Sequence, residues 1–229
     1  MTLESNKILG GIGSILLLIG ILPLLGSYTY GILSLVGLIM VLVALRGFSK
    51  IYNEKGIFDN AIYALVVGVV GAVSTAVIAV FAILSNLDAL ENFLLQIFPT
   101  WTKGDWSALS GMSPTVTNAN NIDFSPLVTF ALEIVLALVV FIVFAIVAMY
   151  FFRRSLKQLS VKSAVGLFAT AGLILFIGAF LLILIIIPGL IAIYIGIIVM
   201  IIAFFQIKPQ PEQPPATAMI TPPLTPTPV

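Results

Sequence analysis

The sequence predicts an all-α integral membrane protein: a bundle of six transmembrane helices, N-in and C-in, with one short amphipathic helix in the outer loop. Hydrophobic residues make up 61% of the 229 residues and charged residues 8%, whereas a soluble domain carries about 25% charged residues. Lipid must therefore surround most of the chain. Several apolar runs reach or approach the roughly 20 residues that cross a bilayer. Lysines and arginines gather on one side of these runs.

The first two predicted spans form a tight hairpin. The first follows Lys7 and is longer than the roughly 7–15 apolar residues of a signal peptide, so we expect a retained helix. A short turn at residues 26–29 leads into the second. In the third span, small residues recur every four positions and would let a neighbouring helix approach closely. The predicted spans are 8–25, 30–45, 61–84, 126–152, 163–187 and 190–207, and they form one domain, 1–207.

The fourth span has the clearest boundaries. Ser125-Pro126 is a favourable helix start, since a hydroxyl can cap the helix and proline lacks an N–H that would need a partner there. The apolar run ends at Phe152, and a basic connection, residues 153–162, is expected next. Ser163 is then predicted to cap the fifth span, and Pro188-Gly189 to form the tight turn before the sixth.

The outer loop, residues 86–124, is the one substantial segment predicted outside the membrane. Leucines at helical spacing predict an amphipathic helix over 87–98, with a capping box at Ser85–Asp88. Trp101 and Trp106 are expected at the level of the lipid headgroups. At the other end of the chain, residues 208–229 hold eight of the 13 prolines. We expect this segment to be a disordered, Pro-rich cytoplasmic tail.

The cations predict the orientation. In a six-span arrangement only Lys103 lies on the outer side, so both termini are assigned to the cytoplasm and the protein to the plasma membrane. The remaining nine cations lie on the inner side: Lys7, Arg46, Lys50, Lys55, Arg153, Arg154, Lys157, Lys162 and Lys208.

The stretch Asn6-Lys7-Ile8-Leu9-Gly10-Gly11-Ile12-Gly13 is the most distinctive short motif. It resembles the opening of an uncharacterised family of archaeal and bacterial multi-pass membrane proteins, classed as a domain of unknown function. The layout of paired apolar spans with basic inner connections is similar as well. The resemblance implies an integral membrane protein of archaeal origin, and it assigns no activity or functional residue.

Glu133 is the ionisable side chain inside a predicted span. An intramembrane carboxylate is by default a functional-site hypothesis, here a proton or cation site. Thr129 lies one turn away on the same helix, and Ser74 and Thr75 of the third span would be partners if that helix packs alongside. The alternative is a carboxyl near the outer interface that bonds a neighbouring helix and has no transport role.

The rest of the composition excludes several kinds of catalytic and metal-binding chemistry. The chain has no cysteine and no histidine, which removes disulfides, thiol catalysis, imidazole bases and the usual zinc sites. We therefore expect no enzyme and no cofactor, and the net charge of +1 suggests no nucleic-acid partner. The basic connection could contact anionic lipid headgroups, although its charges would also serve orientation alone. The residues concerned are Arg153, Arg154, Lys157 and Lys162.

Two functional classes remain. The first is a non-catalytic structural or accessory protein, a subunit of a membrane complex or of a homo-oligomer, with lipid and other membrane subunits or itself as partners. The second is a small transporter or channel that uses Glu133. The first two and last two spans also share a loose glycine pattern. That pattern is either a parallel internal repeat or the chance similarity of aliphatic sequences.

Overall fold

The computed structural model describes residues 2–21, 29–115, 122–125 and 127–208, and within these ranges the regular elements are all helical. Pro126 of the predicted helix start, most of the predicted turn at 26–29 and the predicted disordered tail from residue 209 lie outside the described residues. The elements are α1 (Leu3–Ile21), α2 (Thr29–Ile51), α3 (Lys55–Ser85), α4 (Leu87–Ile97), the short 3-10 helix η2 (Ala108–Gly111), α5 (Leu127–Ser163), α6 (Leu167–Leu184) and α7 (Ile186–Gln206).

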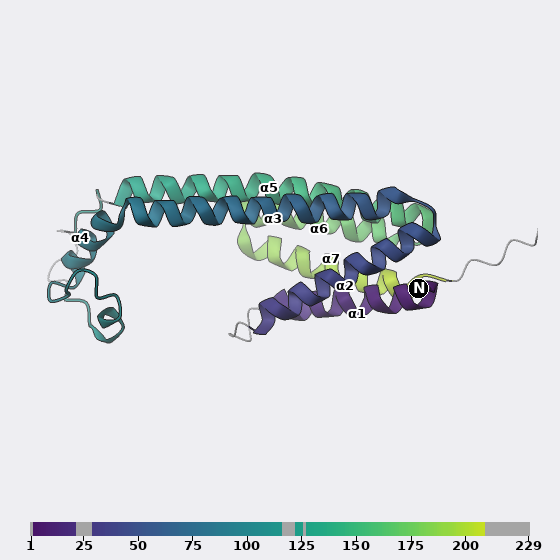
Figure 1. The fold of residues 1–229 in the computed structure, drawn as a ribbon, viewed down its shortest axis with the longest axis horizontal. Helices are drawn as coiled ribbons and strands as arrows, with labels where there is room; N and C mark the ends of the chain where they lie inside the picture. The colour runs from purple at the N-terminus through teal and green to yellow at the C-terminus, as the bar shows by residue number, and fades with distance from the viewer. Residues whose placement is uncertain (1, 22–28, 116–121, 126, 209–229) are drawn as a thin grey trace, which may run out of the picture.

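The six longer helices form a ring in chain order. Each of α1, α2, α3, α5, α6 and α7 packs against the next, and α7 returns to pack against α1. Connections at the basic end are short: residues 52–54 join α2 to α3, and residues 164–166 join α5 to α6. Short links between long helices favour antiparallel neighbours, and this accounts for the up-and-down order seen in Figure 1.

The buried core lies toward the end of the ring that carries the N-terminus and the α5–α6 loop. The Phe204 ring meets Phe168 edge-on with centroids 5.0 Å apart, and stacks on Phe48 at 6.1 Å. The α5 residues buried completely in this cluster are Leu156 and Leu159. Packing therefore continues beneath the basic segment of α5, beyond the point where its apolar run ends.

The helices fall into two length classes. At about 1.5 Å per residue, the 37 residues of α5 span about 55 Å and the 31 residues of α3 about 46 Å. The 18 residues of α6 span about 27 Å and the 21 of α7 about 31 Å. Because α5 and α6 meet at a three-residue loop, α5 extends about 28 Å past the far end of α6. Figure 1 shows α3 and α5 projecting together beyond the other four helices of the ring.

Several predicted boundaries were wrong in an informative way. The basic stretch 153–162 is a helical continuation of α5 and not a connection, because Ser155, Leu156, Leu159 and Ser160 are buried against neighbouring helices. Ser163 ends α5, its hydroxyl donating to the Leu159 carbonyl at 2.7 Å, and does not cap α6. The chain reverses at Ala164, whose φ of 58° lies in the left-handed region.

The turn between the last two helices also differs from the prediction. The helical pattern breaks at Ile185, and Pro188 and Gly189 lie inside the first turn of α7. Proline is tolerated there because its missing N–H would have no helical partner. Gly189 packs directly against the backbone of Leu182, which leaves no room for a side chain.

The helix predicted in the outer loop is confirmed as α4, one residue shorter than expected. Its capping box is not: Asn86 occupies the N-cap position, but its side chain makes no cap hydrogen bond. The end of α4 is tied to the segment before α5, where the Asp123 N–H donates to Gln96 Oε1 at 2.7 Å. Trp101 is buried and packs edge-on against Trp106 with centroids 5.3 Å apart.

Five helices in the described part of the chain are long and apolar enough to cross a membrane: α1, α2, α3, α5 and α7. The remaining member of the ring, α6, is apolar as well, but its apolar stretch at residues 167–182 is shorter than the length required of a membrane-crossing helix. The predicted spans correspond in order to 3–21, 29–51, 55–85, 127–163, 167–184 and 186–206.

Candidate functional site

The carboxylate of Glu133 ties the far ends of α3 and α5 together. The side-chain amide of Asn86, just past the end of α3, donates a hydrogen bond to Glu133 Oε2 at 2.9 Å. The Ser85 hydroxyl lies 3.1 Å from the same oxygen. The Asn86 amide also donates to the Ala82 carbonyl at 2.9 Å, which holds it over the last turn of α3. Glu133 itself is partly exposed.

The structure does not bring the predicted partners to this carboxylate. Ser74 and Thr75 lie ten or more residues before Ser85 on the same helix, about 15 Å along its axis. Within the described residues the buried Thr75 hydroxyl has no hydrogen-bond partner. Thr129 lies one turn before Glu133 on α5 and is exposed. The true partners were visible in the sequence, but there they were interpreted as a capping box.

The position of Glu133 along α5 is as informative as its partners. Twenty residues separate it from Arg153, about 30 Å at the rise of a helix. That distance matches the hydrocarbon thickness of a bilayer. Arg153 follows the apolar part of α5 directly, and Glu133 lies near its other end, two turns after the helix begins at Leu127, and not at its middle.

The basic ends of α3 and α5 are tied by a second set of polar contacts. The Asn60 amide donates to Gln158 Oε1 at 3.2 Å and to the Gly56 carbonyl at 2.6 Å. The buried Ser155 hydroxyl donates to the Ile57 carbonyl at 2.5 Å. Between the two ties, Gly71 packs directly against the side chain of Phe144. The longest helix pair is thus closely packed along its axis and hydrogen-bonded near both ends.

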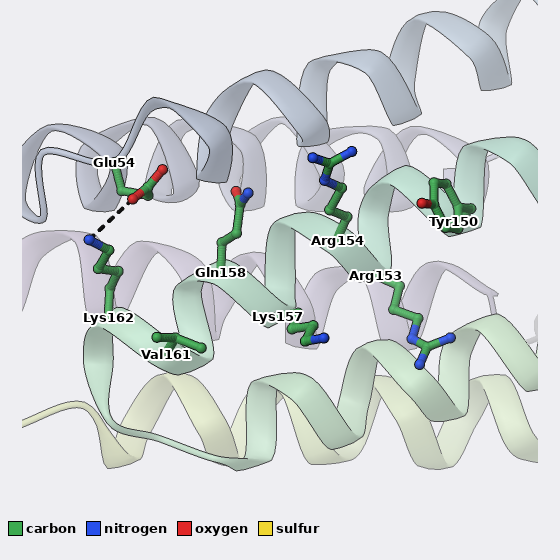
Figure 2. Close-up of a pocket in the computed structure, with 8 residues that line it drawn as sticks. All are labelled: Glu54, Tyr150, Arg153, Arg154, Lys157, Gln158, Val161 and Lys162. Atoms are coloured by element: carbon green, nitrogen blue, oxygen red, sulfur yellow. Dashed lines mark ion pairs between the residues drawn. The ribbon is translucent and has the colours of Figure 1, made fainter.

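The four predicted lipid-contact residues line a single pocket on α5, shown in Figure 2. The cavity has a volume of about 530 Å³ and opens to the surface beside α3 and α6. Lys162 Nζ pairs with Glu54 Oε2 at 3.1 Å. The Arg153 guanidinium lies over the Phe176 ring of α6, 5.5 Å from its centroid. The lining consists of Glu54, Tyr150, Arg153, Arg154, Lys157, Gln158, Val161 and Lys162.

Sequence reasoning gave no structural role to Asn6. Its side chain is fully buried against Gly47 of α2, and among the described residues neither its amide nitrogen nor its oxygen has a hydrogen-bond partner. Unpaired buried amides are costly and uncommon. The residue belongs to the distinctive N-terminal motif, in which Gly10 and Gly11 pack against α7 and Gly13 against α2. The motif therefore serves the packing of α1 against both neighbouring helices.

The cavities inside the ring are apolar. One is lined by residues of all six long helices, among them Leu17, Leu42, Ala64, Phe152 and Ile197, and has a volume of about 360 Å³. A second, of about 670 Å³, lies between the α3–α5 pair and the α6–α7 hairpin. Glu133 lines neither of them.

Comparisons with known proteins agree with the general class. The profile of one family, described as a protein of unknown function (DUF996), matches residues 33–205. The N-terminal motif lies before the matched range. An uncharacterised protein of the archaeon Methanocaldococcus jannaschii is 27% identical over 208 residues, which cover 90% of this chain and 94% of the relative. No solved structure matches the chain.

Proposed function

Because the chain belongs to the DUF996 family of proteins of unknown function, we propose that it is a non-catalytic multi-pass membrane protein that acts as a structural or accessory subunit of a membrane complex or homo-oligomer. The observation that carries this proposal is that the outer half of the α3–α5 pair extends past the other four helices of the ring. There the two helices contact each other and expose apolar side chains to their surroundings, whereas their basic halves pack within the ring.

The exposed surface is large and continuous along both helices. Val77 and Phe81 of α3 are 62% and 66% exposed, and Leu132 of α5 is 65% exposed. Such a surface must be covered by lipid or by another apolar helix.

For the topology, we propose that six helices enter the bilayer and that both termini face the cytoplasm at the plasma membrane. The supporting pattern is the one-sided distribution of cations: Lys103 lies in the outer segment, and the other nine lie at the opposite end. The amphipathic helix α4 and the tryptophan pair after it suit the outer interface. The separation of about 30 Å between Glu133 and Arg153 suits a bilayer boundary near each residue.

The transport alternative rests on Glu133. In its favour, the carboxylate is partly exposed and so is open to a proton or cation. Against it, both hydrogen bonds reach the end of an adjacent helix, as expected of a structural tie. Glu133→Gln in reconstituted vesicles separates the two, since the amide oxygen can still accept from Asn86. Loss of proton or cation flux with unchanged stability would establish transport, and the absence of flux in both proteins would exclude it.

The subunit proposal is tested by chemical cross-linking in native membranes. The chain has no cysteine, so each single-cysteine variant reports on one position. We expect Val77→Cys and Leu132→Cys to form cross-links to another polypeptide, identified by mass spectrometry as a different chain or a second copy. Ile198→Cys on α7 is the matched control, an exposed apolar residue near the basic end. Equal cross-linking of all three, or none at any, would contradict the proposal.

A further inference from the structure

The basic pocket on α5 has the composition of an anion site. Arg153, Arg154, Lys157 and Lys162 contribute four positive charges to its lining, and Glu54 contributes one negative charge. Glu54 pairs with Lys162. In the described part of the chain, the other three cations form no ion pair with a carboxylate. We propose that this pocket binds the phosphate group of an anionic lipid headgroup from the cytoplasmic leaflet.

The two arginines of the pocket lining point to different sides of α5. Figure 2 shows Arg153 directed toward α6 and Arg154 directed the opposite way, with Lys157 on the Arg153 side and closer to the loop. The contact with Phe176 holds the Arg153 guanidinium by a cation–π interaction. A guanidinium presents planar pairs of donors that match two phosphate oxygens, and a lysine adds a point charge. Arg153 and Lys157, one turn apart on the same side of α5, therefore suit a phosphate bound between them, and Arg154 adds its charge from the other side of the pocket lining.

The depth of the pocket favours a lipid as the source of that phosphate. Its arginines come directly after Phe152, the last residue of the apolar run of α5. Tyr150 closes the apolar end of the pocket and is 51% exposed. Tyrosine is enriched at the level of the headgroups, and basic pockets between membrane helices on the cytoplasmic side bind phosphorylated headgroups. The acyl chains would then lie along the exposed apolar surface of α5.

The pocket exists only because α5 continues as a helix through the basic stretch. In that helix Arg153 and Lys157 are four residues apart and share a face, as do Arg154 and Gln158. Gln158 is held by the Asn60 amide at 3.2 Å, so one wall of the pocket is fixed to α3. An extended connection would have dispersed these side chains.

A free phosphate compound offers the same oxygens as a lipid headgroup, and the experiment distinguishes the two. The purified full chain is studied by native mass spectrometry with phosphatidylglycerol, with zwitterionic phosphatidylcholine, and with glycerol 3-phosphate as the soluble probe. We expect retention of phosphatidylglycerol alone, and a loss of at least tenfold in its apparent affinity in the double variant Arg153→Gln/Arg154→Gln. Preferential retention of the soluble probe would overturn the lipid assignment.

A matched control removes the same charge elsewhere on the basic side. Lys50→Gln/Lys55→Gln deletes two cations that do not line the pocket, and we expect its affinity for phosphatidylglycerol to stay within twofold of the parent. An equal loss in both double variants would mean diffuse attraction without a site and would overturn the proposal. If the first variant does not fold, Arg153→Lys/Arg154→Lys keeps the charge. We expect that variant to lose affinity by a smaller factor, because bidentate contacts are removed.

This inference depends on the membrane placement proposed above but not on the subunit role. Lipid binding without any cross-linked partner would leave the pocket established and the subunit proposal contradicted. Cross-linking to a partner without selective lipid binding would support the subunit proposal and contradict the lipid site.

Discussion

Glu133 Oε2 accepts a hydrogen bond from the Asn86 side-chain amide at 2.9 Å, across 47 residues of sequence. Asn86 lies just past the last residue of α3 and Glu133 near the start of α5, so the contact closes the long helix pair at its outer end. Glu133 therefore bonds a neighbouring helix, the arrangement that the sequence offered as the alternative to a proton or cation site.

We expect Asn86→Ala to destabilise the protein by about 1–2 kcal/mol, the range of polar contacts between membrane helices and of buried groups that lose a partner. Thermal unfolding in detergent micelles would measure the change. Ser74→Ala serves as the control: it also removes a hydroxyl from α3, but one that does not contact Glu133. Equal effects of the two substitutions would show that the Asn86–Glu133 contact contributes nothing specific.

The close approach of α3 and α5 at Gly71 gives a second prediction. A Cβ at this position would collide with the Phe144 side chain, whereas a Cβ at Gly68 would meet Ala148 at an ordinary 3.9 Å. Gly71→Ala should therefore destabilise the protein by about 1–3 kcal/mol through overpacking. Gly68→Ala should be neutral or stabilising by up to about 1 kcal/mol, because alanine favours a helix. Denaturant titration of the two variants side by side would test the pair.

The tip of the α6–α7 hairpin should lie within the bilayer. Leu182 and Leu190 line one cavity with Leu138 and Ile142 of α5. These α5 residues are five and nine positions past Glu133, about 8 and 14 Å along the helix. No polar side chain lies between Gly172 and Tyr194, and Ile187 is 72% exposed, as suits a turn surrounded by hydrocarbon.

Cysteine labelling from outside the cell would test this depth. We expect Ile187→Cys to resist a membrane-impermeant maleimide, while Thr102→Cys in the outer segment reacts. Equal reactivity would mean that α6 and α7 cross the membrane completely, as the six-span prediction holds.

The outer loop gives a prediction for acid pH. Hydrogen bonds from the Ser107 hydroxyl and the Ala108 N–H lower the pKa of Asp105 below its ordinary value of 3.8. The ionised Asp105 carboxylate therefore stabilises this turn at pH values above its ordinary pKa. That stabilisation is lost as the pH falls through the lower pKa of the folded protein. Trp101 Nε1 donates to the Asp105 carbonyl at 2.6 Å, so tryptophan fluorescence reports on the turn.

We therefore expect the fluorescence of Trp101 and Trp106, the two tryptophans of the chain, to change with a midpoint below pH 3.8. In Asp105→Asn the transition should disappear. A midpoint well above the ordinary value of aspartate, or an unchanged transition in the variant, would assign the change to another group.

The sequence by itself determined that lipid surrounds most of this protein and that its apolar segments are helices. The apolar runs are long, and charged residues make up 8% of the whole chain. Inside lipid, such runs form helices because a helix satisfies all its backbone hydrogen bonds within one segment. The leucine spacing after Ser85 was sufficient to locate α4. Both features depend on local composition and periodicity, which sequence displays directly.

Tertiary structure decided where helices end and which polar groups meet. Hydropathy ended the fourth span at Phe152, but α5 continues to Ser163 because Ser155, Leu156 and Leu159 are buried by other helices. Glu133 meets Ser85 and Asn86, and not Ser74 or Thr75, because the register of α3 against α5 follows from packing at sites such as Gly71. Hydropathy measures the preference of each residue for lipid or water, whereas register and helix length depend on contacts between segments far apart in the chain.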